Sequence, residues 1–224
     1  MCVKTCKEEK MDVNTDFIWR VKLEKLVKKL QENQMDAFIV DSKEEILLLL
    51  DSLLKPGSTV NAGGSMTLQE TGILDYLRKG DFIFFDRNNP DVKSGEEIKA
   101  IYRQAFSADY YFASTNAITA DGWLYNVDGR GNRVAAMIYG PENVIIVCGR
   151  NKWVKDLDAA IERNREIAAP GNCVRLSKKT PCALSGSCED CKSPDRICNE
   201  FTIIKRNLPK GRIKVILLNF EAGY

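Results

Sequence analysis

The hydrophobic positions along the chain switch repeatedly between a helical period and short continuous runs. Leu23, Leu26, Val27 and Leu30 recur at helical spacing with lysines on the opposite face, so residues 17–30 predict an amphipathic helix. Further helices are expected at 42–54, 68–77, 98–106, 133–138 and 154–168. Apolar runs that predict buried strands lie at 37–40, 59–60, 82–85, 110–113, 144–147 and 215–218, with a shorter strand at 124–127.

This alternation of strands and helices is typical of a three-layer α/β/α fold with a mostly parallel sheet. The folded domain is expected to span residues 17–224, after a flexible N-terminus at 1–16. Residues 170–209 depart from the alternation, because cysteine, serine, glycine and proline punctuate them and their hydrophobic periodicity is weak. They are therefore expected to form a cysteine-rich loop insertion near the C-terminus.

The composition narrows the class of protein. With 224 residues, 44% hydrophobic and 29% charged, the chain is long enough for a domain with a substantial core. A net charge of +2 without a basic stripe gives no reason to expect binding to nucleic acid or to a membrane. The longest apolar run, 46–50, is too short to span a bilayer, and residues 1–11 lack a secretory signal. We therefore expect a cytoplasmic protein whose cysteines stay reduced.

The sequence contains no histidine, which excludes Ser-His and Cys-His catalysis and His-ligated zinc. Any metal must then be held by thiolates or carboxylates. Cys182, Cys188, Cys191 and Cys198 follow the spacing C-x5-C-x2-C-x6-C, with Cys173 nearby as a spare. The C-x2-C step lets two thiolates reach one ion, and the flanking cysteines can close a tetrahedral site or an iron–sulfur cube.

Iron–sulfur and zinc compete for this predicted site. Knuckle-type zinc sites use two close C-x2-C pairs, whereas this segment has one pair, and the ferredoxin spacing is not matched either. The favoured interpretation is an iron–sulfur cluster of the 4Fe–4S type, with zinc as the alternative and incidental thiols as the third. Cys2 and Cys6 are expected to be exposed free thiols, and Cys148 a small buried residue.

Polar loops follow three of the predicted strands, at 61–67, 115–133 and 149–152. The first contains two adjacent glycines before a helix, where free N–H groups attract phosphate or carboxylate, although a plain strand-to-helix turn explains it equally well. Loops at the carboxyl ends of parallel strands are where open α/β sheets bind ligands, so the three are expected to form an anion pocket. The residues expected to line it are Gly63, Gly64, Ser65, Thr67, Asn116, Asp121, Asn132, Arg133 and Lys152. Glu70 and Asp121 are the available acid/base groups.

Several of these segments together resemble the LUD domain family (lactate utilization protein C-like), and within it the short members that carry a cysteine motif. The residues that carry the resemblance are 63–72, 116–122, 126–135, 139–149, Asn151 and Lys152. The resemblance implies a fold like that of ribose-phosphate isomerase, glucosamine-phosphate deaminase and CoA transferases. It also implies a part in oxidising lactate to pyruvate, alongside partner proteins of the iron–sulfur or flavin type.

The leading hypothesis is an accessory redox protein of organic-acid metabolism that binds an iron–sulfur cluster and a small anionic ligand. The first alternative is an isomerase or acyl-transferase-type enzyme with a structural metal, in which Glu70 or Asp121 acts as acid, base or acyl acceptor. The second alternative is a zinc-stapled interaction protein that performs no chemistry.

Overall fold

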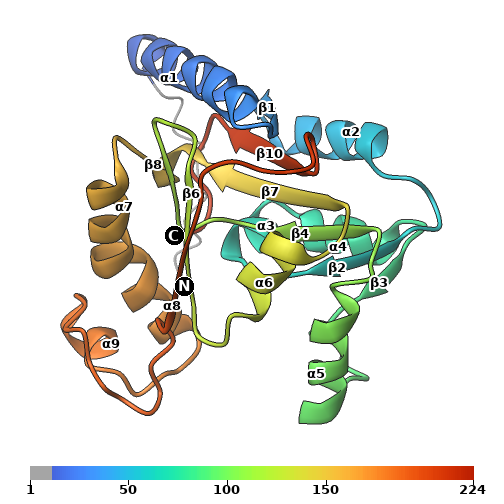
Figure 1. Cartoon of the computed structure of the whole chain (residues 1–224), viewed down its shortest axis with the longest axis vertical. Helices are drawn as coiled ribbons and strands as arrows, with labels where there is room; N and C mark the ends of the chain where they lie inside the picture. Colours follow the sequence, from blue (N-terminus) through green and yellow to red (C-terminus); the bar gives the residue numbers. More distant parts are fainter. Residues whose placement is uncertain (1–11) are drawn as a thin grey trace, which may run out of the picture.

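The computed structural model of the chain describes residues 12–224 (Figure 1). The expectations for Cys2, Cys6 and the first eleven residues lie outside this part. Helix α1 (Val13–Glu32) begins four residues before the predicted start at 17, and the Asp12 carboxylate caps it by accepting a hydrogen bond from the Thr15 backbone N–H. The expected flexible segment therefore does not extend over residues 13–16.

A parallel sheet forms the centre of the described chain, and its six strands follow the order β1-β10-β7-β4-β2-β3. The strands are β1 (Asp36–Val40), β2 (Thr59–Ala62), β3 (Ile83–Phe85), β4 (Tyr110–Ala113), β7 (Asn143–Gly149) and β10 (Ile213–Leu218). Each coincides with one of the predicted apolar runs. The predicted α/β fold with a mostly parallel sheet is confirmed.

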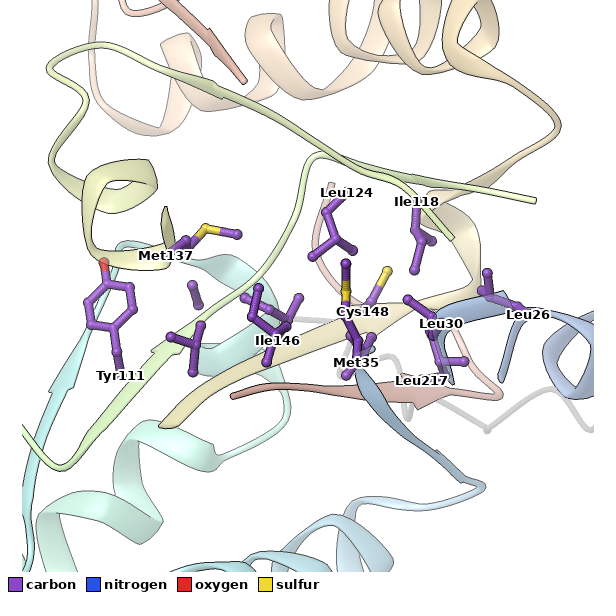
Figure 2. Packing of buried hydrophobic residues seen from close by; sticks show 14 of the residues in the cluster. Leu26, Leu30, Met35, Tyr111, Ile118, Leu124, Met137, Ile146, Cys148 and Leu217 are labelled. Atoms are coloured by element: carbon purple, nitrogen blue, oxygen red, sulfur yellow. The ribbon is translucent and has the colours of Figure 1, made fainter. Parts of the chain in front are cut away.

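Helices cover both faces of this sheet, because alternate residues of each central strand point to opposite sides. The covering helices are α1 and α6 (Asn132–Tyr139) on one face, and α2 (Lys43–Leu53), α3 (Met66–Glu70) and α4 (Ile73–Lys79) on the other. Ile146 and Cys148 of β7 pack into the first core, and Ile145 and Val147 into the second. Figure 2 shows the first core, in which Cys148 is a small buried residue as predicted.

A smaller sheet stands beyond the carboxyl ends of the central strands, with the order β8-β5-β6-β9 in the described residues. Its strands are β5 (Ala117–Thr119), β6 (Leu124–Asp128), β8 (Trp153–Val154) and β9 (Glu200–Ile204). The sequence predicted β6 alone. β5 and β8 are too short to give a periodic signal, and β9 is an edge strand whose Phe201 and Ile203 side chains are exposed.

A long helical region runs along the smaller sheet and continues into the segment that was expected to be loops. It consists of α7 (Leu157–Arg163), a π-helical turn (Asn164–Ala168) and α8 (Ala169–Arg175). The predicted helix at 154–168 thus starts later, where Asp156 caps α7, and extends past Pro170. Proline is tolerated there because it stands in the first turn of α8.

Within the expected loop insertion at 170–209, the structure adds regular elements between the loops: most of α8, the short α9 (Cys182–Ser185) and strand β9. Helices α7, α8 and α9 lie together on one side of the molecule, at the left of Figure 1. Helix α5 (Gly95–Gln104) projects at the other side, beside β3. Within residues 12–224, no helix combines the length and the apolar character needed to cross a membrane.

Candidate functional site

A cavity of about 560 Å³ lies where the carboxyl ends of β2, β4 and β7 meet the cysteine segment, which we define as residues 182–198. Six of the nine residues predicted to bind a ligand line it: Gly64, Ser65, Asn116, Asn132, Arg133 and Lys152. The three polar loops thus do converge, as expected for neighbouring parallel strands. The far wall comes from α8 and from residues 194–199.

The cavity is strongly cationic. Among the described residues, seven basic and two acidic side chains line it: Arg87, Arg130, Arg133, Lys152, Arg175, Lys178 and Arg196, against Asp128 and Asp195. Both acids are already paired, since an Asp128 carboxylate oxygen lies 2.7 Å from an Arg133 nitrogen and an Asp195 oxygen lies 3.7 Å from Lys178 Nζ. Excess positive charge in a recessed site attracts anions, so the cavity is suited to a carboxylate or a phosphate.

Lys152 is the most unusual of these cations, because only 3% of its surface is exposed. Its ammonium donates hydrogen bonds to Thr67 Oγ1 at 2.8 Å and to Ser114 Oγ at 3.0 Å, and no carboxylate pairs with it in the described chain. Burial lowers the pKa of Lys152 from 10.5 to about 8, because an ammonium away from water is destabilised, and nearby arginines lower it further. Thr67 was predicted to touch a ligand; it instead positions Lys152.

Arg133 also lines the cavity, but all of its donors are used inside the protein. Its Nε donates to Asp128, and its two terminal nitrogens donate to Asn116, Asn126 and the carbonyl oxygens of Ser114 and Val127. A guanidinium has five N–H groups, so none remains for a ligand. Arg133 therefore holds the strand ends together rather than binding a ligand as predicted.

The adjacent glycines of the first loop make room for side chains. A Cβ atom at Gly64 would overlap Nη2 of Arg87, and one at Gly63 would lie 2.8 Å from the Tyr111 hydroxyl. Ser65 caps α3 by accepting a hydrogen bond from the Leu68 N–H at 3.3 Å. Sequence reasoning missed Arg87, although its position just after the predicted strand at 82–85 was an available signal.

The two predicted acid/base groups lie outside the cavity. Glu70 is exposed, and its carboxylate accepts a hydrogen bond from the Gly223 N–H at 2.7 Å, which anchors the last residues of the sequence. Asp121 is exposed in the turn between β5 and β6, where its carbonyl oxygen accepts from Asn33 Nδ2 at 2.8 Å. Neither carboxylate lines the cavity, so the structure does not bring these two groups into the predicted anion pocket.

The four predicted metal ligands lie in one region. Cys182 and Cys198 are buried, whereas Cys188 and Cys191 are partly exposed. Burial raises the pKa of the Cys198 thiol, and the neighbouring thiols of the other three act in the same direction. In the described chain, no three Cys, Asp or Glu side chains stand close enough together to hold one metal ion.

Two further side chains lie beside the four predicted cysteines. Cys173 Sγ lies 3.6 Å from Cys182 Sγ, so the spare cysteine belongs to the same group of thiols. The Tyr125 hydroxyl is buried without a hydrogen-bond partner in the described residues, and the pKa of Tyr125 is raised by burial and by Cys198 and Cys188 nearby. A buried hydroxyl without a partner costs about 1–3 kcal/mol, which an acceptor placed among these thiols would relieve.

The cysteine segment and the cavity share a wall, which the sequence did not indicate. Cys198 itself lines the cavity, together with Arg196. The Arg196 guanidinium donates to the carbonyl oxygens of Cys198 and Cys191, and the Cys188 N–H donates to the Arg165 carbonyl in the π-helical turn at 3.0 Å. The segment is thereby held between the π-helical turn and the cavity.

Comparisons with known proteins agree with this architecture. The family model described as LUD domain matches residues 23–218. A DUF162 family protein from Deinococcus radiodurans has a similar fold, with a TM-score of 0.51 at 12% identity over 89% of this chain and 98% of that one. No curated protein sequence matches the chain.

Two further solved structures share about half of the chain. They are eIF2B beta from Chaetomium thermophilum (TM-score 0.37, 15% identity, 52% of this chain and 44% of that one) and the translation initiation factor eIF-2B from Pyrococcus horikoshii OT3 (TM-score 0.33, 17% identity, 52% and 48%).

Proposed function

Since this chain belongs to the LUD domain family, which is linked to lactate utilization, we propose that it is an accessory redox protein of organic-acid metabolism. In this proposal the cationic cavity binds a small anion, and Cys182, Cys188, Cys191 and Cys198 hold an iron–sulfur cluster. The observation that carries it is the shared wall, in which Cys198 lines the cavity that contains Lys152 and Arg87. The proposed ligand and the proposed cluster would then be neighbours.

The charge of the cavity supports a small carboxylate as the ligand. Arg87 has no ion pair in the described residues, and its Nη1 donates to the Tyr102 hydroxyl at 3.2 Å. The remaining N–H groups of Arg87 are thus free for an anion, and a planar guanidinium matches a carboxylate in a two-pronged hydrogen bond.

The spacing of the cysteines supports a cluster over a single zinc ion. Knuckle-type zinc sites use two close C-x2-C pairs, whereas this segment has one such pair, Cys188 and Cys191. A cube accepts one thiolate at each iron, so the more distant Cys182 and Cys198 can complete its ligands. The unpartnered Tyr125 hydroxyl suits the sulfur acceptors that a cluster would bring. When bound, such a cluster supplies one-electron transfer.

The partly exposed cysteines suggest where a redox partner docks. Cys191 lines a surface hollow with Lys192 and Ser193, and the hollow shares Pro194, Arg196 and Asn199 with the ligand cavity. A partner of the iron–sulfur or flavin type would approach the cluster there. Electrons would then pass between the partner in this hollow and the ligand in the adjacent cavity.

Metal analysis of protein purified without oxygen tests the cluster. We expect a brown protein with about four irons and four sulfides per chain, and loss of both after Cys191→Ser. Cys148→Ala is the matched control, because Cys148 is buried in the core away from the segment, and it should retain the iron. A colourless protein with one zinc per chain would overturn the redox proposal.

Calorimetry with lactate and pyruvate tests the anion site. Arg87→Gln is expected to weaken binding, since it removes a cation from the cavity wall. Arg103→Gln serves as the control, because Arg103 is exposed on α5 and does not line the cavity. Equal loss of binding in both variants would show that the interaction is a general surface effect.

The isomerase or acyl-transferase alternative loses its proposed acid/base groups, since Glu70 and Asp121 lie outside the cavity.

A further inference from the structure

Among the described residues that line the cavity, Lys152 has surroundings that suit a reactive amine as well as a cation. The side chain follows β7 through the 3-10 turn η1 (Arg150–Lys152), so a rigid part of the sheet fixes its position. Two hydroxyls, those of Thr67 and Ser114, hold the nitrogen at 2.8 and 3.0 Å. An ammonium has three N–H groups, so one valence of this nitrogen is left to face the cavity that Lys152 lines.

A counter-ion role alone does not explain why this lysine is so deeply buried. An amine that only attracts anions works best as a fully charged ammonium, and burial opposes that charge. The titratable groups that act on Lys152 are Arg163 and Arg133, which disfavour the ammonium, and Glu70 and Cys148, which favour it in their ionised forms. With burial the strongest of these effects, the neutral amine is far more accessible near physiological pH than it is in an exposed lysine. A neutral, desolvated lysine amine is a nucleophile for carbonyl groups.

We propose that the Lys152 amine forms an imine with a carbonyl compound that carries an anionic group and is held in this cavity. The inference rests on the proposed anion site, because Arg87 and its neighbouring cations would hold the anionic group. The nitrogen lone pair attacks the carbonyl carbon, and the carbonyl oxygen takes up the two hydrogens of the amine and leaves as water. A C=N bond thus replaces the C=O bond, and no oxidant or reductant is required.

The two hydroxyls are placed to assist both steps. Thr67 Oγ1 accepts from Lys152 and donates to the Ala222 carbonyl oxygen at 3.1 Å, and Ser114 Oγ lies 3.4 Å from Thr67 Oγ1. When both N–H groups of the neutral amine are donated to these hydroxyls, its lone pair is left for the cavity that Lys152 lines. The hydroxyls can also pass the amine's protons to the departing oxygen.

Reductive trapping tests the imine. The purified protein is incubated with pyruvate in one arm and dihydroxyacetone phosphate in the other, and cyanoborohydride then fixes any C=N bond as a stable amine. Peptide mapping by mass spectrometry locates the modification. We expect one reduced adduct per chain, on Lys152, in the arm whose anionic group the cavity prefers.

Two variants separate nucleophilicity from charge. Lys152→Arg keeps a cation at this position but cannot form an imine, so the adduct should disappear. Lys214→Arg is the matched control, because burial also lowers the pKa of Lys214 but its side chain bonds to Asn143 and Gly211 outside the cavity. This variant should be trapped as efficiently as the original protein.

The outcomes distinguish this inference from the function it builds on. Saturable anion binding without an adduct on Lys152 overturns the imine and leaves the anion site standing. Adducts scattered over exposed lysines, together with no measurable binding, overturn both. If Lys152→Arg does not fold, the mapped position of the adduct in the unsubstituted protein still decides.

Discussion

Replacing Lys152 with methionine removes the buried amine while keeping a side chain of similar length, and it isolates what burial of the ammonium costs the fold. The pKa of this amine is about 8 in the folded chain, against 10.5 when it is unperturbed. Between these values the unfolded chain binds more protons than the folded chain does, so stability rises with pH across the window. Below pH 8 the full cost of the buried charge is present, and above pH 10.5 it is gone.

The size of this change in stability with pH follows from the pKa shift of Lys152. Each unit of pKa difference corresponds to about 1.4 kcal/mol, so the original protein should gain about 2.5 kcal/mol relative to Lys152→Met between pH 7 and pH 10. Urea unfolding of both proteins, followed by tryptophan fluorescence at several pH values, measures this difference. Groups that titrate equally in the two proteins cancel in the comparison. A difference that stays constant over the whole range would show that Lys152 titrates as an exposed lysine, and would refute the reasoning on its burial.

Three further predictions concern the cavity and the core. Gly64→Ala should displace Arg87 and weaken anion binding by calorimetry roughly tenfold, the loss of one hydrogen bond to a charged group; Gly95→Ala meets no atom within 4 Å and should leave binding unchanged. Arg133→Met should lower the free energy of unfolding by about 3–5 kcal/mol, because the buried Asp128 carboxylate loses its cation and keeps only two backbone N–H donors; an unfolding curve like that of the original protein would contradict the role given to this arginine. Burial raises the pKa of the Cys148 thiol to about 11, so its alkylation at pH 8 should be about a hundredfold slower in the folded than in the unfolded protein, from the thiolate fraction alone; equal rates would contradict its burial.

The layered fold was predictable because its signal is local. The runs at 144–147 and 215–218 are apolar on both faces, and such strands occur where a parallel sheet is covered by helices on both sides. The π-helical turn and α8 were not predictable in the same way. Pro170 and the weak periodicity around it indicated a loop. In the structure α7 packs on the smaller sheet through Leu157 and Ala160, and α8 continues this helical region with Pro170 in its first turn.

The location of the candidate site was predictable from the sequence, but the role of each residue in it was not. Loops at the carboxyl ends of strands pointed to Lys152 and Arg133 together, and nothing in their sequence context separates them. In the folded chain the N–H groups of Arg133 donate five hydrogen bonds inside the protein. The Lys152 ammonium donates two, so one of its N–H groups remains for the cavity. Glu70 and Asp121 were chosen as acids near the right loops, yet neither lines the cavity.

By itself the sequence determined the layered α/β architecture, the exclusion of histidine chemistry and the grouping of four cysteines, because each depends on composition or on residues a few positions apart. Only the tertiary structure decided which polar groups remain free and what stands beside them. Lys152 is held by Thr67, 85 positions away, and the cysteine segment forms the wall of the ligand cavity. Burial and hydrogen-bond partners of this kind arise from distant segments brought together by the sheet, and no local pattern records them.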